Sequence, residues 1–177
     1  MNLKRAERKA YWLLDEMNIS APSVPVEKIA EDLNIKLVYE KLEKDLSGFL
    51  FKDDTSEESF IFINEGHSIN RKRFTIAHEL GHYLLHSDKQ DEAHIDRGFT
   101  INFRSPLSSK AVNPKEIEAN AFAAALLMPE ELIIEEIQKK IKDGIDLVES
   151  IELKEIAKKF EVSEQALCFR LGKLGYL

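Results

Sequence analysis

This 177-residue chain is poor in cysteine, with Cys168 as its one example. A single cysteine excludes an intrachain disulfide, so the fold must be held by a hydrophobic core, and we expect a cytoplasmic location. Long apolar runs are also missing. No stretch reaches the about 18 residues that a membrane-spanning helix needs, so we expect no membrane partner. Residues 1–17 are basic, but charges interrupt their apolar stretches, and we therefore expect no signal peptide.

An excess of positive charge is absent as well. The chain has 25 lysines and arginines against 32 aspartates and glutamates, which gives a net charge of −7. This balance argues against nucleic-acid binding over the whole surface. Hydrophobic residues make up 44% of the chain and charged residues 32%, which is typical of a globular domain and not of a disordered one.

Periodic patterns predict an α+β fold in which helices pack on a small three-stranded sheet. Asn34 is placed to end a second short helix, and Ser68 or Asn70 can cap the helix that runs to about His86. Pro114 favours the start of another helix. The predicted strands are 35–40, 47–53 and 59–64, with a hairpin turn between the last two. Besides the helices that end near Leu33 and His86, the predicted helices are 3–17, 114–128, 129–142, 151–159 and 163–172.

Two segments shape the expected domain organisation. Residues 87–113 carry few periodic signals and predict a long loop, and loops of this length are often functional. The last two helices, joined by a short turn, have the outline of a helix-turn-helix. We therefore expect a domain over residues 1–142 and a helical extension over residues 143–177 that packs on the same unit.

The segment TIAHELGHYLLH, residues 75–86, contains a candidate metal site. It matches the pattern H-E-x-x-H at His78, Glu79 and His82. Residues four apart lie on one helix face, so both imidazoles can reach a single Zn²⁺. Glu79 lies about 100° from His78 around the helix axis, so it flanks the ion and can accept a proton from water. The alternative is a helix that packs two histidines with no metal.

A catalytic zinc site needs a third protein ligand. The segment PKEIEANAFAAALLMP offers Glu116, with Asn120 one helical turn later to steady a liganding imidazole. Its small residues would let this helix approach the histidine helix closely; they are Ala119, Ala121, Ala123, Ala124 and Ala125.

Three other residues compete for the same role. Glu118 points about 200° away from Glu116 around the helix, so only one of the two carboxylates can face the metal. His86 has drifted about 80° from the direction of His78, which favours a neighbouring role over ligation. His94 lies in the predicted loop, where no pattern positions it.

Together these segments resemble the ImmA/IrrE family of metallopeptidases. RFTIAHELGHYLLH is followed by EIEANAFAAALLMP, and SVPVEKIAEDLNI and IAKKFEVSEQALCFRLGKLG are similar as well, so the resemblance covers nearly the whole chain. It extends more distantly to thermolysin-like zinc peptidases. The resemblance implies one Zn²⁺ per chain held by His78, His82 and Glu116, with Glu79 as general base and Asn120 supporting an imidazole. Residues 1–142 would then form a zinc metallopeptidase domain.

The resemblance also implies a substrate. Family members are expected to cleave repressors of the helix-turn-helix type, which relieves repression in mobile elements or stress responses. The predicted function is therefore a zinc-dependent endopeptidase acting on such a repressor. The alternative is a non-catalytic regulator that binds a repressor or sensor without cutting it. Glu79 favours the enzyme, because a binding module has no need of a base.

Charge bears on two further features. Basic and acidic residues nearly cancel in the last two helices, whereas a module that binds phosphates should be more basic, so we expect no direct DNA binding there. These helices are expected to pack on the catalytic domain or to contact the substrate. Arg71-Lys72-Arg73, at the start of the histidine helix, is typical of a solvated face.

Overall fold

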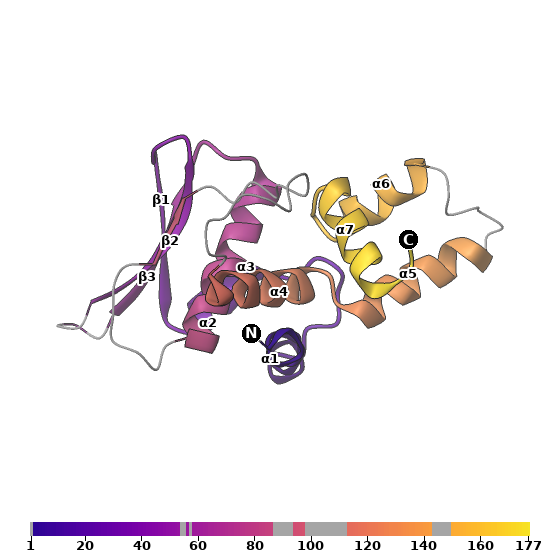
Figure 1. Cartoon of the computed structure of the whole chain (residues 1–177), viewed down its shortest axis with the longest axis horizontal. Coiled ribbons are helices and arrows are strands. Elements are labelled where there is room, and N and C mark those ends of the chain that lie inside the picture. The colour runs from indigo at the N-terminus through magenta and orange to yellow at the C-terminus, as the bar shows by residue number, and fades with distance from the viewer. Residues whose placement is uncertain (1, 54–55, 57, 87–93, 98–112, 143–149) are drawn as a thin grey trace.

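The computed structural model describes residues 2–53, 56, 58–86, 94–97, 113–142 and 150–177 (Figure 1). Its helices are α1 (Leu3–Glu16), α2 (Val26–Asp32), α3 (Ile69–His86), α4 (Pro114–Leu127), α5 (Glu130–Lys142), α6 (Ser150–Lys159) and α7 (Glu164–Leu174). Its strands are β1 (Ile35–Glu40), β2 (Leu46–Asp53), β3 (Glu58–Asn64) and β4 (His94–Arg97). No helix within these ranges is both long and apolar enough to cross a bilayer.

The strands form one mixed sheet in the order β1-β3-β2-β4. β1 runs parallel to β3, and β2 runs antiparallel to both β3 and β4. The three predicted strands are confirmed, and Asp53 faces Glu58 where the expected hairpin closes. The fourth strand was not predicted, because residues 87–113 were expected to form a loop. A strand of four residues is too short to show a clear alternation of polar and apolar side chains.

The two faces of the sheet carry different side chains. Leu50, Ile61 and Ile63 are buried and belong to one hydrophobic core with residues of the helices. Phenylalanines line the opposite face, where the rings of Phe49 and Phe62 stack with centroids 4.6 Å apart. This alternation is what a strand with period two produces when helices cover one face.

Gly48 allows α3 to lie close to the sheet. A Cβ atom at this position would meet the carbonyl oxygen of Phe62 at 2.3 Å and a methyl carbon of Thr75 at 2.6 Å. Any larger residue would therefore push α3 away from β2 and β3. Because α3 carries the H-E-x-x-H pattern, this close contact also determines how far the candidate site lies from the sheet.

The helices start and end largely where local signals indicated. Ser68, and not Asn70, precedes α3, and its carbonyl accepts from the N–H of Lys72. Asn34 has φ of 58°, a left-handed conformation that asparagine tolerates, and it ends α2 as predicted. Asn113 caps α4 with its side chain, and Pro114 is the first residue of that helix.

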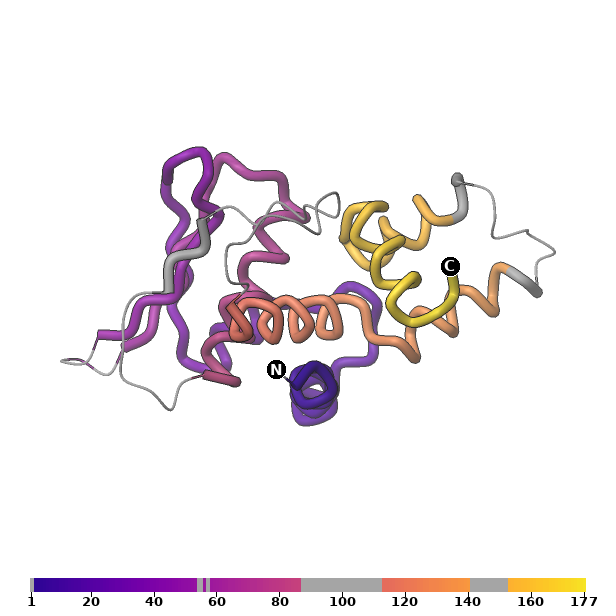
Figure 2. The backbone as a smooth tube through the Cα atoms, viewed as in Figure 1, coloured from indigo at the N-terminus to yellow at the C-terminus, as the bar shows by residue number. Residues whose placement is uncertain are grey.

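In the middle of the molecule α4 packs on α3, and α1 packs on α4 (Figure 2). The sheet lies on one side of these helices, and α5, α6 and α7 lie on the other. The α6–α7 pair has the predicted helix-turn-helix outline, with Ser163 capping α7. Its buried residues, including Phe160 and Leu167, belong to the same hydrophobic core as α1.

Two arginines join the C-terminal helices to the rest of the chain. Arg170 of α7 is buried; its guanidinium donates to the carbonyl of Met128 at 3.2 Å and to Glu7 of α1 at 2.9 Å. Arg73 of α3 donates to the carbonyl of Val24 and pairs with Glu161 at 3.1 Å. The expectation of a solvated face is wrong for Arg73, whose side chain is 5% exposed.

Candidate metal centre

Two imidazoles from α3 meet at the interface between α3 and α4. His78 and His82 are one helical turn apart, so they project from one face of α3. Their ring centroids lie 4.6 Å apart, their Nε2 atoms are separated by 3.0 Å, and both side chains are buried. The helix therefore brings two nitrogen donors to one point in the interior.

Glu116, in the first turn of α4, completes a donor triangle with these two nitrogens. Its carboxylate oxygens lie 3.3 Å from Nε2 of His78 and 3.3 Å from Nε2 of His82. Ligands at about 2.0–2.1 Å from a tetrahedral zinc ion are separated from one another by about 3.3–3.4 Å. The distance from His78 ends on Oε2 of Glu116 and that from His82 ends on Oε1, and each is close to the distance between two ligands of a tetrahedral metal site.

The chemistry of the donors also fits a divalent metal. Asn120 places Oδ1 2.9 Å from Nδ1 of His78. Because an amide oxygen can only accept, the proton of His78 belongs on Nδ1, which leaves the lone pair of Nε2 pointing into the donor triangle. Imidazole nitrogen and carboxylate oxygen suit Zn²⁺, and the same ligands accept Mn²⁺ or Fe²⁺.

The protonation of Glu116 favours a cation as well. Burial raises the pKa of this carboxyl, but the two imidazoles beside it lower that pKa to well below its usual value. The carboxylate is therefore ionised at neutral pH and adds a negative charge to the two nitrogen donors. Among the described residues, His78, His82 and Glu116 are the group whose donor atoms could hold a metal ion.

Glu79 lies beside the donor triangle without belonging to it. It is fully buried on α3, with 0% of its surface exposed. Its direction around the helix lies to one side of both histidines, about 100° from His78 and about 60° from His82. This position suits a carboxylate that acts on a molecule bound at the metal and not as a ligand.

The rival ligands face other partners. Glu118 accepts a hydrogen bond from the backbone N–H of Asn2, at the start of α1. Nε2 of His86 lies 3.3 Å from the carbonyl oxygen of Lys115 and 3.9 Å from Glu118. His86 is therefore a neighbour of the donor triangle, as expected. The side chain of His94 lies outside the part of the chain that the structure describes.

Gly81 supports the site and was not singled out in the sequence. A Cβ atom there would lie 3.1 Å from both Cα and O of Ala119 and 3.1 Å from the ring of Phe122. Glycine thus lets α3 and α4 approach each other at the level of the ligands, as the alanines of α4 do. A glycine inside a helix destabilises that helix by about 1 kcal/mol relative to alanine. A glycine within the H-E-x-x-H segment therefore indicates, from the sequence alone, a close contact with a neighbouring element.

Comparison with known families agrees with this geometry. Residues 30–172 match the model of the peptidase family M78, described as the IrrE N-terminal-like domain. The chain belongs to this family. The predicted resemblance to the ImmA/IrrE metallopeptidases is confirmed, and the protein is a metallopeptidase of the ImmA/IrrE type.

Individual relatives of this ImmA/IrrE protein are distant. Metallopeptidase ImmA of Bacillus subtilis (strain 168) is 26% identical over 150 residues, which cover 83% of this chain and 76% of that protein. The radiation response metalloprotease IrrE of Deinococcus radiodurans is 31% identical over 115 residues, which cover 65% of this chain and 31% of that protein.

One solved structure extends the likeness to the fold. A Mycobacterium tuberculosis transcriptional regulator superimposes with a TM-score of 0.63 at 16% identity, over 96% of this chain and 46% of that chain. The ImmA/IrrE chain therefore spans less than half the length of that regulator and about a third of the length of IrrE. At this identity the likeness concerns the fold alone.

Proposed function

We propose that this protein is a zinc-dependent endopeptidase in which His78, His82 and Glu116 hold the metal and Glu79 is the general base. The observation that carries the proposal is the donor triangle, in which two imidazole nitrogens and the two carboxylate oxygens of Glu116 converge with separations of 3.0–3.3 Å, close to those between the ligands of a tetrahedral zinc ion. Membership of a metallopeptidase family supports it independently.

In this proposal each residue has a separate task. His78, His82 and Glu116 would hold a zinc ion, which would supply a Lewis acid able to polarise the peptide carbonyl and to lower the pKa of water. Glu79 takes a proton from the attacking water and passes it to the nitrogen of the leaving amine. Asn120 holds His78 in the tautomer that presents Nε2. Burial of Glu79 keeps bulk water away from its carboxylate.

We further propose a protein substrate of the helix-turn-helix repressor class, whose cleavage would relieve repression in the cytoplasm. The competing function is a regulator that binds such a repressor without cutting it. Glu79 is the residue that separates the two, because a metal-dependent fold needs no buried carboxylate beside its ligands merely to bind a protein.

Replacing Glu79 by glutamine tests the proposal. The shape of the side chain is kept, so zinc content, fold and repressor binding should remain near wild type. An amide cannot accept the proton of water, so cleavage should fall by about 10²–10⁴, the usual worth of general acid–base catalysis. Cleavage of a candidate helix-turn-helix repressor, such as one encoded next to this protein, is followed by gel electrophoresis.

The matched control is Glu118→Gln, which makes the same chemical change in a carboxylate that faces α1. This variant should cleave like wild type, and a chelator-treated sample should not cleave. The deciding comparison is made in cells that contain the repressor. If Glu79→Gln relieves repression as fully as wild type does, proteolysis is not the mechanism and the binding function should replace it.

A further inference from the structure

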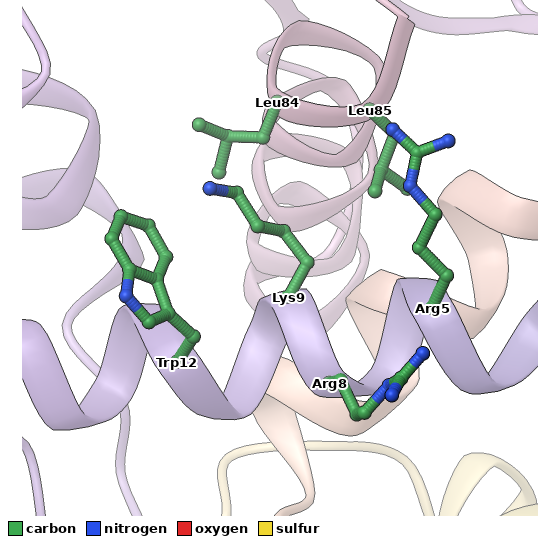
Figure 3. A pocket seen from close by; sticks show the side chains of 6 residues that line it. All are labelled: Arg5, Arg8, Lys9, Trp12, Leu84 and Leu85. Atoms are coloured by element: carbon green, nitrogen blue, oxygen red, sulfur yellow. The ribbon is translucent and has the colours of Figure 1, made fainter.

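A basic groove lies between α1 and the C-terminal end of α3. It encloses about 430 Å³ and is lined by Arg5, Arg8, Lys9 and Trp12 of α1 and by Leu84 and Leu85 of α3 (Figure 3). Arg5, Lys9 and Trp12 follow one another at helical spacing and project from α1 toward the two leucines. The groove thus combines cations at its rim with an apolar floor.

The cations of this groove have no acidic partner within the part of the chain that the structure describes. None of the ion pairs found there includes Arg5, Arg8 or Lys9. Elsewhere on the chain cations do find acidic partners, as in the pair of Lys28 with Asp32 at 2.5 Å and that of Lys173 with Glu7 at 3.0 Å. Unpaired positive charge is notable in a chain of net charge −7.

Trp12, the one tryptophan of the chain, is 46% exposed beside these cations. The ammonium of Lys9 lies 3.6 Å from the centroid of its ring, in a cation–π contact. Large exposed aromatic residues next to arginine are enriched at protein interfaces. Since Lys9 covers one face of the indole, that face is closed to the base stacking by which proteins bind single-stranded nucleic acids.

The groove is separate from the candidate metal centre. The residues that line the groove do not include His78, His82 or Glu116. Leu84 points about 200° from His82 around the axis of α3, and Leu85 lies three residues beyond His82 toward the C-terminal end of the helix. The chemistry of the groove and that of the metal can be tested apart.

We propose that this groove is a docking site for an acidic, extended segment of a partner protein that carries an apolar side chain between its carboxylates. Arg5 and Lys9 are about 6 Å apart along α1. Alternate residues of an extended chain are separated by about 6.6 Å and point the same way, so two carboxylates at such positions match the two cations. The side chain between the two carboxylates points the opposite way, toward Leu84 of α3. The inference does not depend on peptidase activity.

Trp12 provides the assay, because its emission reports on the groove alone. The full-length protein is titrated with a short synthetic peptide in which glutamates alternate with leucine and phenylalanine, and binding is measured by tryptophan emission and by anisotropy of a labelled peptide. Binding should weaken as salt is added. A peptide with glutamine in place of glutamate should bind at least about tenfold more weakly, which corresponds to about 1.4 kcal/mol.

Charge reversal tests whether Arg5 and Lys9 bind the peptide. Arg5→Glu combined with Lys9→Glu should weaken peptide binding by at least about tenfold. The matched control is Lys41→Glu combined with Lys44→Glu, which changes the net charge equally in the exposed connection between β1 and β2 and should bind within about twofold of wild type. Glu79→Gln should also bind like wild type.

Three results would overturn the docking site. The first is that the acidic peptide does not bind, and the second is that both double variants lose binding equally, which would mean a response to net charge alone. The third is that a single-stranded oligothymidylate of equal charge binds more tightly than the peptide and loses affinity in the Arg5/Lys9 variant, which would assign the groove to nucleic acid. Far-ultraviolet circular dichroism tests whether each variant is folded; the side chains substituted in the two double variants lie on the surface or at the groove rim.

Discussion

Among the described residues, the contact of α7 with α1 and that of α3 with α4 each hold a cluster of buried polar groups, and these two clusters differ in which atoms meet. In the Arg170 cluster (Arg170, Glu7, Tyr11 and Lys173) donors face acceptors: the guanidinium donates to Glu7 at 2.9 Å and to the hydroxyl of Tyr11 at 2.8 Å. In the donor triangle, a lone pair of His78 and two carboxylate oxygens of Glu116 converge with His82.

This difference separates a structural cluster from a binding site. Complementary groups satisfy one another, so the Arg170 cluster needs nothing more to hold α7 against α1. A convergence of acceptors is stabilised by a cation, and the geometry of the donor triangle matches the size of a tetrahedral one. Changes in the donor triangle should therefore alter metal content, and changes in the Arg170 cluster should alter stability.

The largest effect is expected from removal of an imidazole. Wild-type protein should hold about one equivalent of zinc, and His78→Ala or His82→Ala should lose most of it, because two remaining ligands make a poor zinc site. Elemental analysis after dialysis measures this. His86→Ala, one turn further along α3, is the matched control and should keep its zinc. Wild-type zinc levels in both ligand variants would refute the assignment.

Next in size is the contrast between the two glutamates of α4. Glu116→Gln should weaken zinc binding far more than Glu118→Gln, since an amide is a weaker ligand than a carboxylate and Glu118 faces α1. Competition with a chromophoric chelator gives both affinities. The reverse order would mean that α4 is rotated relative to α3, and equal small effects would direct attention to His86 or His94.

Stability should respond to the other cluster. Arg170→Ala removes the donor from the buried carbonyl of Met128 and from Glu7, and should lower the free energy of unfolding by about 3 kcal/mol. Urea unfolding measures the loss, and zinc content at low temperature should be unchanged. Lys154→Ala, exposed on α6, should stay within about 0.5 kcal/mol of wild type. Loss of zinc without loss of stability would reverse the proposed division between the two clusters.

The smallest effect concerns pH and Glu7. Burial raises the pKa of Glu7, but the hydrogen bonds and positive charges of Lys173 and Arg170 together lower that pKa by more than burial raises it. The pKa of Glu7 in the folded state therefore lies below its ordinary value of 4.5. Its contribution to stability is thus complete above that value and is lost as the pH falls through the folded-state pKa. Glu7→Gln should make unfolding less dependent on pH in this acidic range; an unchanged slope would mean that Glu7 is not stabilised as an ion.

The sequence predicted what local signals control. Alternating residues predicted β1 to β3, Asn34 and Ser163 marked helix boundaries, and helical spacing placed His78 and His82 on one face. Local spacing could not choose between Glu116 and Glu118, because that choice depends on how α4 is rotated against α3. The structure brings Glu116 to the imidazoles, while its role as ligand stays a prediction.

The features that the sequence did not predict depend on contacts between segments that are far apart in the chain. β4 forms by pairing with the edge of β2, and the sequence of residues 87–113 has no periodic pattern that predicts a strand. The pattern Arg71-Lys72-Arg73 is typical of a solvated basic run, yet Arg73 is buried and pairs with Glu161, which lies far along the chain. The division at residue 142 stays a prediction. The Arg170 cluster shows that the two expected parts contact each other closely.

The zinc environment itself tests the central claim most directly. X-ray absorption at the zinc edge, on protein loaded with one equivalent of zinc, reports the ligands without relying on activity or on a substrate. We predict a first shell of nitrogen and oxygen at about 2.0–2.1 Å, with outer-shell scattering from two imidazoles that is kept in His86→Ala. A shell that contains sulfur at about 2.3 Å, or scattering from three imidazoles, would contradict a site built from His78, His82 and Glu116.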